Sequence, residues 1–247
     1  MIYRYQGDRE LSGALVGHHI RKDDRVRNGP HVRDALPDWV RDWLSRPRLA
    51  PYVAAAGPAG ALDLYAWNCR ASTALFELIG WFEVAWRNNI DRAICAGRGH
   101  GAPHWLFDRT FPLQPRTWSK VAKAINTVQH GTRRPTSGQV IAELSLGFWR
   151  FTASGYRQTV WLSHLSHAFP HAPHRPRPAE MDRQLDAIIK LRNRIAHHEP
   201  LGSVVEIHRR VADILVIGAS ISPPMAAWWR RRTSVWQVLD RRPPQRG

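Results

Sequence analysis

With 247 residues, 43% of them apolar, the chain is long enough for one domain with a real hydrophobic core and is not disordered as a whole. It carries 36 Lys and Arg against 20 Asp and Glu, a formal charge of +16 that suggests a polyanionic partner; a charge kept for solubility or codon bias is the alternative. No apolar run reaches the roughly 18–20 residues that span a bilayer, and an anionic membrane surface is a weaker competitor.

The two cysteines, Cys69 and Cys95, lie far apart in one helical region, which is typical of neither a disulfide framework nor a zinc site. Residues 1–6 lack the apolar region of a signal peptide. We therefore expect a cytoplasmic protein that uses no cofactor and no metal.

Residues 1–36 are polar and charged with scattered glycines, which predicts a basic N-terminal extension. Two tryptophans and two aliphatic residues at helical spacing predict a helix over 38–44. Pro47 and Pro51 interrupt that pattern, and the sequence AAAGPAG at 54–60 indicates a loop.

The longest helical pattern covers 62–96, where apolar residues keep three- and four-residue steps. Glu83, Arg87 and Asp91 stand four residues apart on a neighbouring face, so they can form intrahelical ion pairs. In the functional alternative, Arg87 and Asn88 supply a second polar pair near an active site.

The middle of the chain predicts a helix over 118–130 and a buried helix over 139–156, with a pair of strands as the alternative for the latter. Glu143 within that apolar run is expected to be half-buried and to need a partner. Four histidines within 164–174 have spacings that suit metal ligands, but the prolines among them favour a histidine-rich surface loop.

Residues 179–198 form the next predicted helix, and the spacing from Ser203 to Glu206 indicates a capping box that begins another. Prolines 223 and 224 break this last helix, and an aromatic, basic tail follows: Trp228, Trp229, Arg230, Arg231 and Arg232. Arg beside Trp can stack on bases or bind phosphate, or a terminal helix can dock by its tryptophans with its polar side in solvent.

An unusual group of polar residues lies near the end of the helix over 179–198. At about 100° per residue, Arg192 points with the buried stripe, whereas His197 lies about 140° away and shares a face with Asn193. A buried guanidinium needs an acid, a carbonyl or a phosphate, and Glu83 and Glu143 are the candidate acids.

His197 and His198 lie in the last helical turn, where the helix dipole favours a protonated imidazole and so helps a general acid. RNA cleavage by its own 2′-OH requires a base, an acid for the leaving 5′-oxygen and a cation on the phosphorane. A His and an Arg can supply these without a metal. The alternative is a hydrogen-bonded His–Asn–Arg cluster that only ties two helices together.

The segment RNRIAH at 192–197 matches the R-x4-H form of the HEPN motif. The surrounding pattern resembles the Abi-like (abortive infection) family of AbiD/AbiF type. The segments that carry this resemblance keep the expected order: RLAPY at 48–52, YAWN at 65–68, EVAWRN at 83–88, ELSLGFW at 143–149 and LRNRIAHH at 191–198.

The resemblance implies an all-α fold, a HEPN-type helical bundle with additional helices and loops over 37–220. A basic segment rich in Trp and Arg follows over 221–247. The resemblance also implies a homodimer whose two motifs face one cleft, and a metal-independent endoribonuclease that acts as a toxin in abortive infection or anti-phage defence.

The resemblance assigns the catalytic pair to Arg192 and His197, with Asn193 as the orienting polar residue. The expected supporting residues are His198, Glu83, Arg87 and Asn88, and the expected RNA-binding residues are Arg194, Arg230, Arg231 and Arg232. Some HEPN toxins have a Tyr two residues after the His, which a partner enzyme modifies; here that position is Glu199, so this form of control is not expected.

The expected partners are an RNA substrate and an antitoxin, itself an RNA or a protein. A catalytically inactive RNA-binding HEPN module is the runner-up interpretation, and a protein-interaction scaffold is the third. One straight helix does not bring Arg192 and His197 to a common point, so either the helix end distorts at Pro200 or a second protomer completes the cleft.

Overall fold

The computed structural model describes residues 36–130 and 134–244, and every regular element within these ranges is helical. The prediction of an all-α fold is therefore confirmed. The elements in chain order are α1 (Asp38–Leu44), α2 (Arg46–Ala96), η1 (Trp105–Phe107), α3 (Pro115–Gln129), α4 (Ser137–Glu143), α5 (Leu146–Ser154), η2 (Arg157–Trp161), η3 (Leu165–His167), α6 (Pro178–Ala196), α7 (Val204–Ile221), α8 (Pro223–Arg232) and α9 (Val235–Leu239). The extension predicted over 1–36 lies, except for Leu36, outside the described residues.

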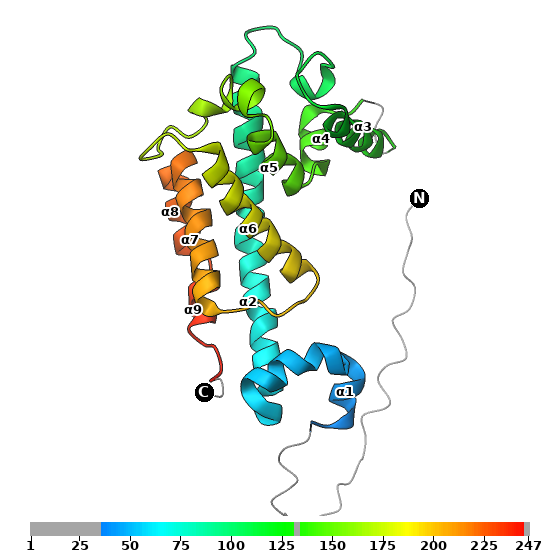
Figure 1. Cartoon of the computed structure of the whole chain (residues 1–247), viewed down its shortest axis with the longest axis vertical. Coiled ribbons are helices and arrows are strands. Elements are labelled where there is room, and N and C mark those ends of the chain that lie inside the picture. The colour runs from blue at the N-terminus through cyan, green and yellow to red at the C-terminus, as the bar shows by residue number, and fades with distance from the viewer. Residues whose placement is uncertain (1–35, 131–133, 245–247) are drawn as a thin grey trace, which may run out of the picture. The chain divides into compact units, whose positions relative to one another are not determined.

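The long helix α2 is the element against which most of the others pack (Figure 1). It contacts α5, α6, α7 and α9, and α6 crosses it obliquely in the view of Figure 1. The core between these helices is aromatic, since Trp67, Trp86, Trp105 and Trp149 are all fully buried. Within the described ranges, no helix combines the length and the apolar character that a membrane crossing requires.

The predicted helix over 62–96 is confirmed as part of α2, but the predicted loop over 54–60 was wrong. The alanines there favour a helix, and the chain stays helical except at Gly57, whose φ of 70° and ψ of 172° produce a kink. The expectation that Pro47 interrupts the helical pattern was also wrong. Pro47 lies in the first turn of α2, where the backbone N–H groups have no partner within the helix, so proline is tolerated there.

The apolar region over 139–156 forms two helices, α4 and α5, rather than one. Leu144 is extended, and the side chain of Ser145 accepts a hydrogen bond from the Phe148 N–H, so a new helix starts there. Glu143 at the end of α4 is exposed, and the expectation that it is half-buried was wrong.

The helices predicted over 38–44, 118–130 and 179–198 are confirmed to within a few residues by α1, α3 and α6. The helix predicted to begin after Ser203 is α7, and the Ser203 hydroxyl accepts from the Glu206 N–H as expected of an N-cap. The prolines at 223 and 224 end α7 and also begin α8, which turns back and packs against α7.

Candidate functional site

The C-terminal half of α6 presents the predicted catalytic residues at different depths. Its buried stripe consists of Met181, Leu185, Ile188, Leu191 and Ile195. Leu191 occupies the buried position next to Arg192, so Arg192 is half-buried beside the stripe rather than at its centre. Asn193 and His197 are exposed. Arg192 is thus more buried than Asn193 and His197 in a single chain, in the direction that the helical period predicts.

The end of α6 is closed by hydrogen bonds that reverse the chain direction. His197 is the C-cap residue, the His198 N–H donates to the Ile195 carbonyl, and the Glu199 N–H donates to the Arg194 carbonyl. This 5→2 and 6→1 pairing is a Schellman motif, in which the residue after the C-cap adopts a left-handed conformation. Glycine usually occupies that position, but here it is His198, with a φ of 54°.

Two side chains from α2 hold the turn that follows. Arg48 Nη1 donates to the His198 carbonyl at 2.5 Å. The buried amide of Asn68 bonds the turn twice, because its Nδ2 donates to the Glu199 carbonyl at 3.4 Å and its Oδ1 accepts from the Leu201 N–H at 2.9 Å. The turn that follows His197 is therefore fixed to α2 at His198, Glu199 and Leu201.

Arg194 braces the same turn from within. Its Nη1 donates to the Leu201 carbonyl at 3.3 Å and lies 3.1 Å from where a Cβ on Gly202 would be. Gly202 has a φ of 89°, so both the conformation and the close approach favour glycine there. The geometry gives Arg194 a structural contact in addition to the RNA contact predicted from the sequence.

A cavity of about 340 Å³ lies behind the turn. Its lining includes Tyr52, Asn68, Leu201 and Arg242. The Arg242 guanidinium lies over the Trp67 ring at 4.9 Å, and burial lowers the pKa of Arg242. Burial, together with the nearby Cys69 and Tyr65 side chains, also raises the pKa of Tyr52 to about 12, so the Tyr52 hydroxyl stays protonated at neutral pH.

The structure does not bring the supporting residues on α2 to this turn within one chain. Asn68 and Arg87 are 19 residues apart on α2, which corresponds to about 28 Å along the axis. Arg87 Nη1 instead donates to the Ala142 carbonyl of α4 at 3.4 Å. Asn88 is exposed and lines a separate cavity with Trp228.

The predicted acidic partners of Arg192 are not found in place. Within residues 36–130 and 134–244, no ion pair or hydrogen bond joins Arg192 to Glu83 or Glu143. The intrahelical ion pairs expected of Glu83, Arg87 and Asp91 are also absent from the described residues. Asp91 instead accepts a hydrogen bond from Trp105.

The basic tail is folded onto the helical core. Trp229 is buried against Gly218 of α7, and Trp228 packs against Trp81 with ring centroids 5.1 Å apart. The docked terminal helix considered from the sequence is therefore present as α8. The cationic side chains in its last turn are exposed: Arg230, Arg231 and Arg232.

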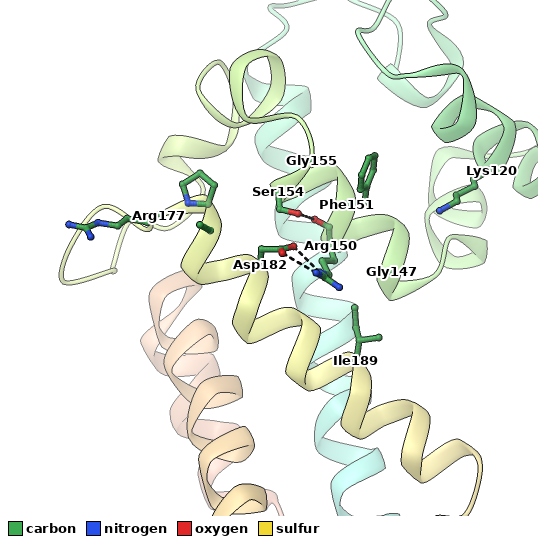
Figure 2. A pocket seen from close by; sticks show the side chains of 11 residues that line it. Lys120, Gly147, Arg150, Phe151, Ser154, Gly155, Arg177, Asp182 and Ile189 are labelled. Atoms are coloured by element: carbon green, nitrogen blue, oxygen red, sulfur yellow. Dashed lines mark hydrogen bonds and ion pairs between the residues drawn. The ribbon is translucent and has the colours of Figure 1, made fainter.

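A larger cavity of about 980 Å³ opens between α3, α5 and α6 (Figure 2). Lys120 of α3 lines one side of this cavity. Arg150 lies between α5 and α6, where its guanidinium pairs with Asp182. Ile189 also lines this cavity and precedes Asn193 by four residues, so the two share one face of α6. The cavity thus opens on the face of α6 that carries Asn193 and His197.

Arg48 and Asn68 are the residues of the candidate site that the sequence alone left unassigned. Both lie in segments that carry the family resemblance, 48–52 and 65–68, but their sequence separation from α6 gives no sign of contact. The one available signal is the asparagine beside apolar residues at 65–68, because a polar group buried among such residues needs hydrogen-bond partners.

No protein-family model, curated protein or solved structure matches the chain.

Proposed function

We propose that the chain is a HEPN-type endoribonuclease of the Abi-like kind, which cleaves RNA by attack of the 2′-OH without a metal ion. One observation supports this most directly. Two segments that carry the resemblance, 48–52 and 65–68, hold the turn at the end of a third, 191–198. Arg48 donates to the His198 carbonyl, and Asn68 bonds Glu199 and Leu201 directly after that segment. An accidental resemblance gives no reason for these three segments to meet.

In this proposal, each residue of the motif has a distinct task. His197, exposed at the end of α6, protonates the leaving 5′-oxygen, and the adjacent exposed His198 accepts the proton of the attacking 2′-OH. Arg192 has no acidic partner among the described residues, which leaves its guanidinium available for the charge of the phosphorane. Asn193 shares a face with His197 and orients the phosphate or the imidazole.

A homodimer is part of the same proposal. Because Arg192 and His197 point about 140° apart around α6, one chain presents them to different surroundings. A two-fold dimer that places the ends of two α6 helices side by side would bring the Arg192 of one protomer to the His197 of its partner.

The charge of +16 fits RNA as the substrate. Arg194, Arg230, Arg231 and Arg232 are the proposed contacts to its backbone. A metal-independent ribonuclease with this fold would serve as a toxin in abortive infection, restrained by an RNA or protein antitoxin.

The proposal is tested by digesting a labelled RNA of mixed sequence in EDTA. We expect wild type to cut RNA, to leave the DNA of the same sequence intact, and to generate 2′,3′-cyclic phosphate ends. His197→Ala and Arg192→Ala are each expected to lower the rate at least about 100-fold, as loss of a general acid or of a charge-stabilising group does.

Two exposed residues away from the turn provide matched controls for this assay. Arg183→Ala on the same helix and His167→Ala in η3 are expected to keep the wild-type rate. RNA left intact by every variant would contradict the nuclease, and activity lost in EDTA would contradict the metal-free mechanism. Salt-sensitive binding without cleavage that survives both active-site substitutions would support the inactive RNA-binding module.

A further inference from the structure

Three potential metal ligands of different chemistry converge where α2 ends. Asp91 and Cys95 are four residues apart on α2 and so lie one turn apart on the same face. His104 comes from the loop after α2, at the start of η1. One carboxylate oxygen, one sulfur and one imidazole nitrogen from these side chains lie within 4.8 Å of one another.

The separations suit a tetrahedral ion. Zinc binds nitrogen and oxygen at about 2.0–2.1 Å, so two such ligands in a tetrahedron lie about 3.3 Å apart. His104 Nε2 lies 3.2 Å from Asp91 Oδ1. The sulfur of Cys95 favours zinc over magnesium or calcium, which prefer oxygen ligands.

Neighbouring groups already hold two of the ligands in orientation. Trp105 Nε1 donates to Asp91 Oδ1 at 2.7 Å, and Trp105 itself is fully buried. The His104 ring stacks on Trp105, with ring centroids 6.2 Å apart and an interplanar angle of 23°. Such outer hydrogen bonds and packing are typical of the surroundings that fix metal ligands.

We propose that Asp91, Cys95 and His104 bind a zinc ion, with water as the fourth ligand. The ion would fasten the loop that follows α2 to the last turns of that helix. Asp91 is 23 residues from Asn68 along α2, about 35 Å along the axis, so the zinc has no part in the proposed RNA cleavage.

Binding requires two proton movements at these ligands. The Cys95 thiol releases its proton to solvent on forming the zinc–sulfur bond. His104 binds through Nε2, so its proton moves to Nδ1, which gives up the 3.3 Å contact it accepts from the Leu106 N–H. Because zinc displaces the thiol proton, zinc binding weakens as the pH falls.

The alternative is that Asp91, His104 and Trp105 form a hydrogen-bonded cluster with no metal, beside which Cys95 is a bystander. The two possibilities differ in the role of the sulfur. A metal site depends on Cys95, whereas the hydrogen-bonded cluster does not.

The test uses the full chain, purified without a polyhistidine tag, stripped with a chelator and titrated with cobalt(II) and then zinc(II). We expect one cobalt per chain, a thiolate-to-cobalt charge-transfer band, and displacement of that band by zinc. Zinc at a hundredfold excess over its Kd is expected to raise the Tm by about 5–10 °C.

Cys95→Ser is expected to remove the charge-transfer band and His104→Ala to weaken binding at least about tenfold, whereas Cys69→Ser, a change at the other cysteine, keeps both. Circular dichroism establishes whether each variant is folded. If a variant does not fold, Asp91→Asn tests the same site by changing its carboxylate ligand. The histidines within 164–174 offer no sulfur, so cobalt bound there gives no such band. A band that persists in folded Cys95→Ser, or no stoichiometric binding by wild type, would overturn the proposal and leave the nuclease untouched.

Discussion

At the scale of single residues, His198 combines an uncommon backbone conformation with an exposed imidazole. Its φ is positive, a conformation that strains residues other than glycine by about 1–2 kcal/mol. The contact from Arg48 uses the His198 carbonyl and does not depend on its side chain. Strain of this kind tends to persist where a side chain has a task, which agrees with the supporting role proposed for His198.

We expect His198→Gly to raise the free energy of unfolding by about 0.5–1 kcal/mol, because glycine adopts this conformation without a Cβ clash. RNA cleavage should fall in the same variant if the imidazole takes part. Urea unfolding measures the first effect, with His197→Gly as the control. His197 has a φ of −91°, so glycine there should lower stability, and equal changes in the two variants would argue against strain at His198.

Asn68 is the buried amide that joins α2 to the turn. Asn68→Ala leaves the Leu201 N–H buried without its acceptor, and we expect a loss of about 1–3 kcal/mol in the free energy of unfolding. The loosened turn should also lower kcat more than it raises KM. Asn126→Ala, an exposed change on α3, is the control, and an equal stability for both variants would contradict the role of Asn68.

The residues of the candidate site were partly predictable for a physical reason. The 3.6-residue period of α6 placed Arg192 near the core and His197 away from it, because helical facing depends on local sequence alone. The bracing by Arg48 and Asn68 was not predictable, since it joins residues 131 and 150 positions apart. Side-chain contacts over such separations follow from the packing of whole helices.

At the scale of elements, two helical glycines have opposite surroundings, one open to solvent and one packed against another helix. Gly80 of α2 is exposed, and a Cβ there meets nothing within 4 Å, so Gly80→Ala should stabilise by about 0.5–1 kcal/mol through helix propensity. A Cβ on Gly218 of α7 would lie 2.4 Å from the Trp229 ring of α8, so Gly218→Ala should destabilise by about 1–3 kcal/mol. Thermal unfolding measures both, and a shift of the same sign in the two variants would contradict the close packing of α7 on α8.

Arg150 ties α5 to α6 through ion pairs with Asp182 and Asp186, at 2.7 and 2.5 Å. Hydrogen bonds from Arg150 and Lys190, respectively, lower the pKa of each carboxyl below its ordinary value of 3.8. Both carboxyls therefore add stability above about pH 4, and this contribution is lost as the pH falls through their lower pKa values in the folded chain.

We expect Arg150→Met to lower the free energy of unfolding by about 1 kcal/mol at pH 7, a modest figure because the pairs are partly exposed. The stability of the variant should also fall less steeply than that of wild type as the pH drops below 4. Urea unfolding from pH 7 to pH 3 tests both effects, with Arg183→Met as the control. Parallel pH curves for wild type and Arg150→Met would contradict this role.

The periodicity of the sequence predicted most of the helices, whereas the boundaries of those helices depended on single residues. The pattern over 62–96 is long and regular, and the helix there was predicted correctly. The break at Leu144 and Ser145 was missed because apolar residues continue across it, and one serine cap decides where α5 begins. The helix through 54–60 was missed because glycine and proline usually end helices, but here Gly57 only bends the chain.

At the scale of the whole molecule, the proposed chemistry depends on a second protomer. Arg192 is half-buried and His197 is exposed on another face, so a single chain gives an incomplete site. In a two-fold dimer, each of two sites would take Arg192 from one protomer and His197 from the other. This arrangement can be separated experimentally from one in which both residues act from the same chain.

The separating experiment mixes two variants that are inactive alone, Arg192→Ala and His197→Ala, and lets their protomers exchange. Random exchange makes half of the dimers mixed, and a mixed dimer has one of its two shared sites intact. We therefore expect about a quarter of the wild-type RNA cleavage rate to return. If both residues act from one chain, no site is restored, because every protomer lacks one of them.

The Arg192→Ala, His197→Ala double variant mixed with wild type is the control for this experiment. In its mixed dimers, each shared site has one defective member, so only the quarter of dimers that are wholly wild type stay active. Sites contained within one chain would instead keep about half of the activity, because half of the protomers are intact. Recovery in the first mixture together with about a quarter in the second would establish shared sites, whereas no recovery and about a half would assign the chemistry to single chains and require the end of α6 to distort at Pro200.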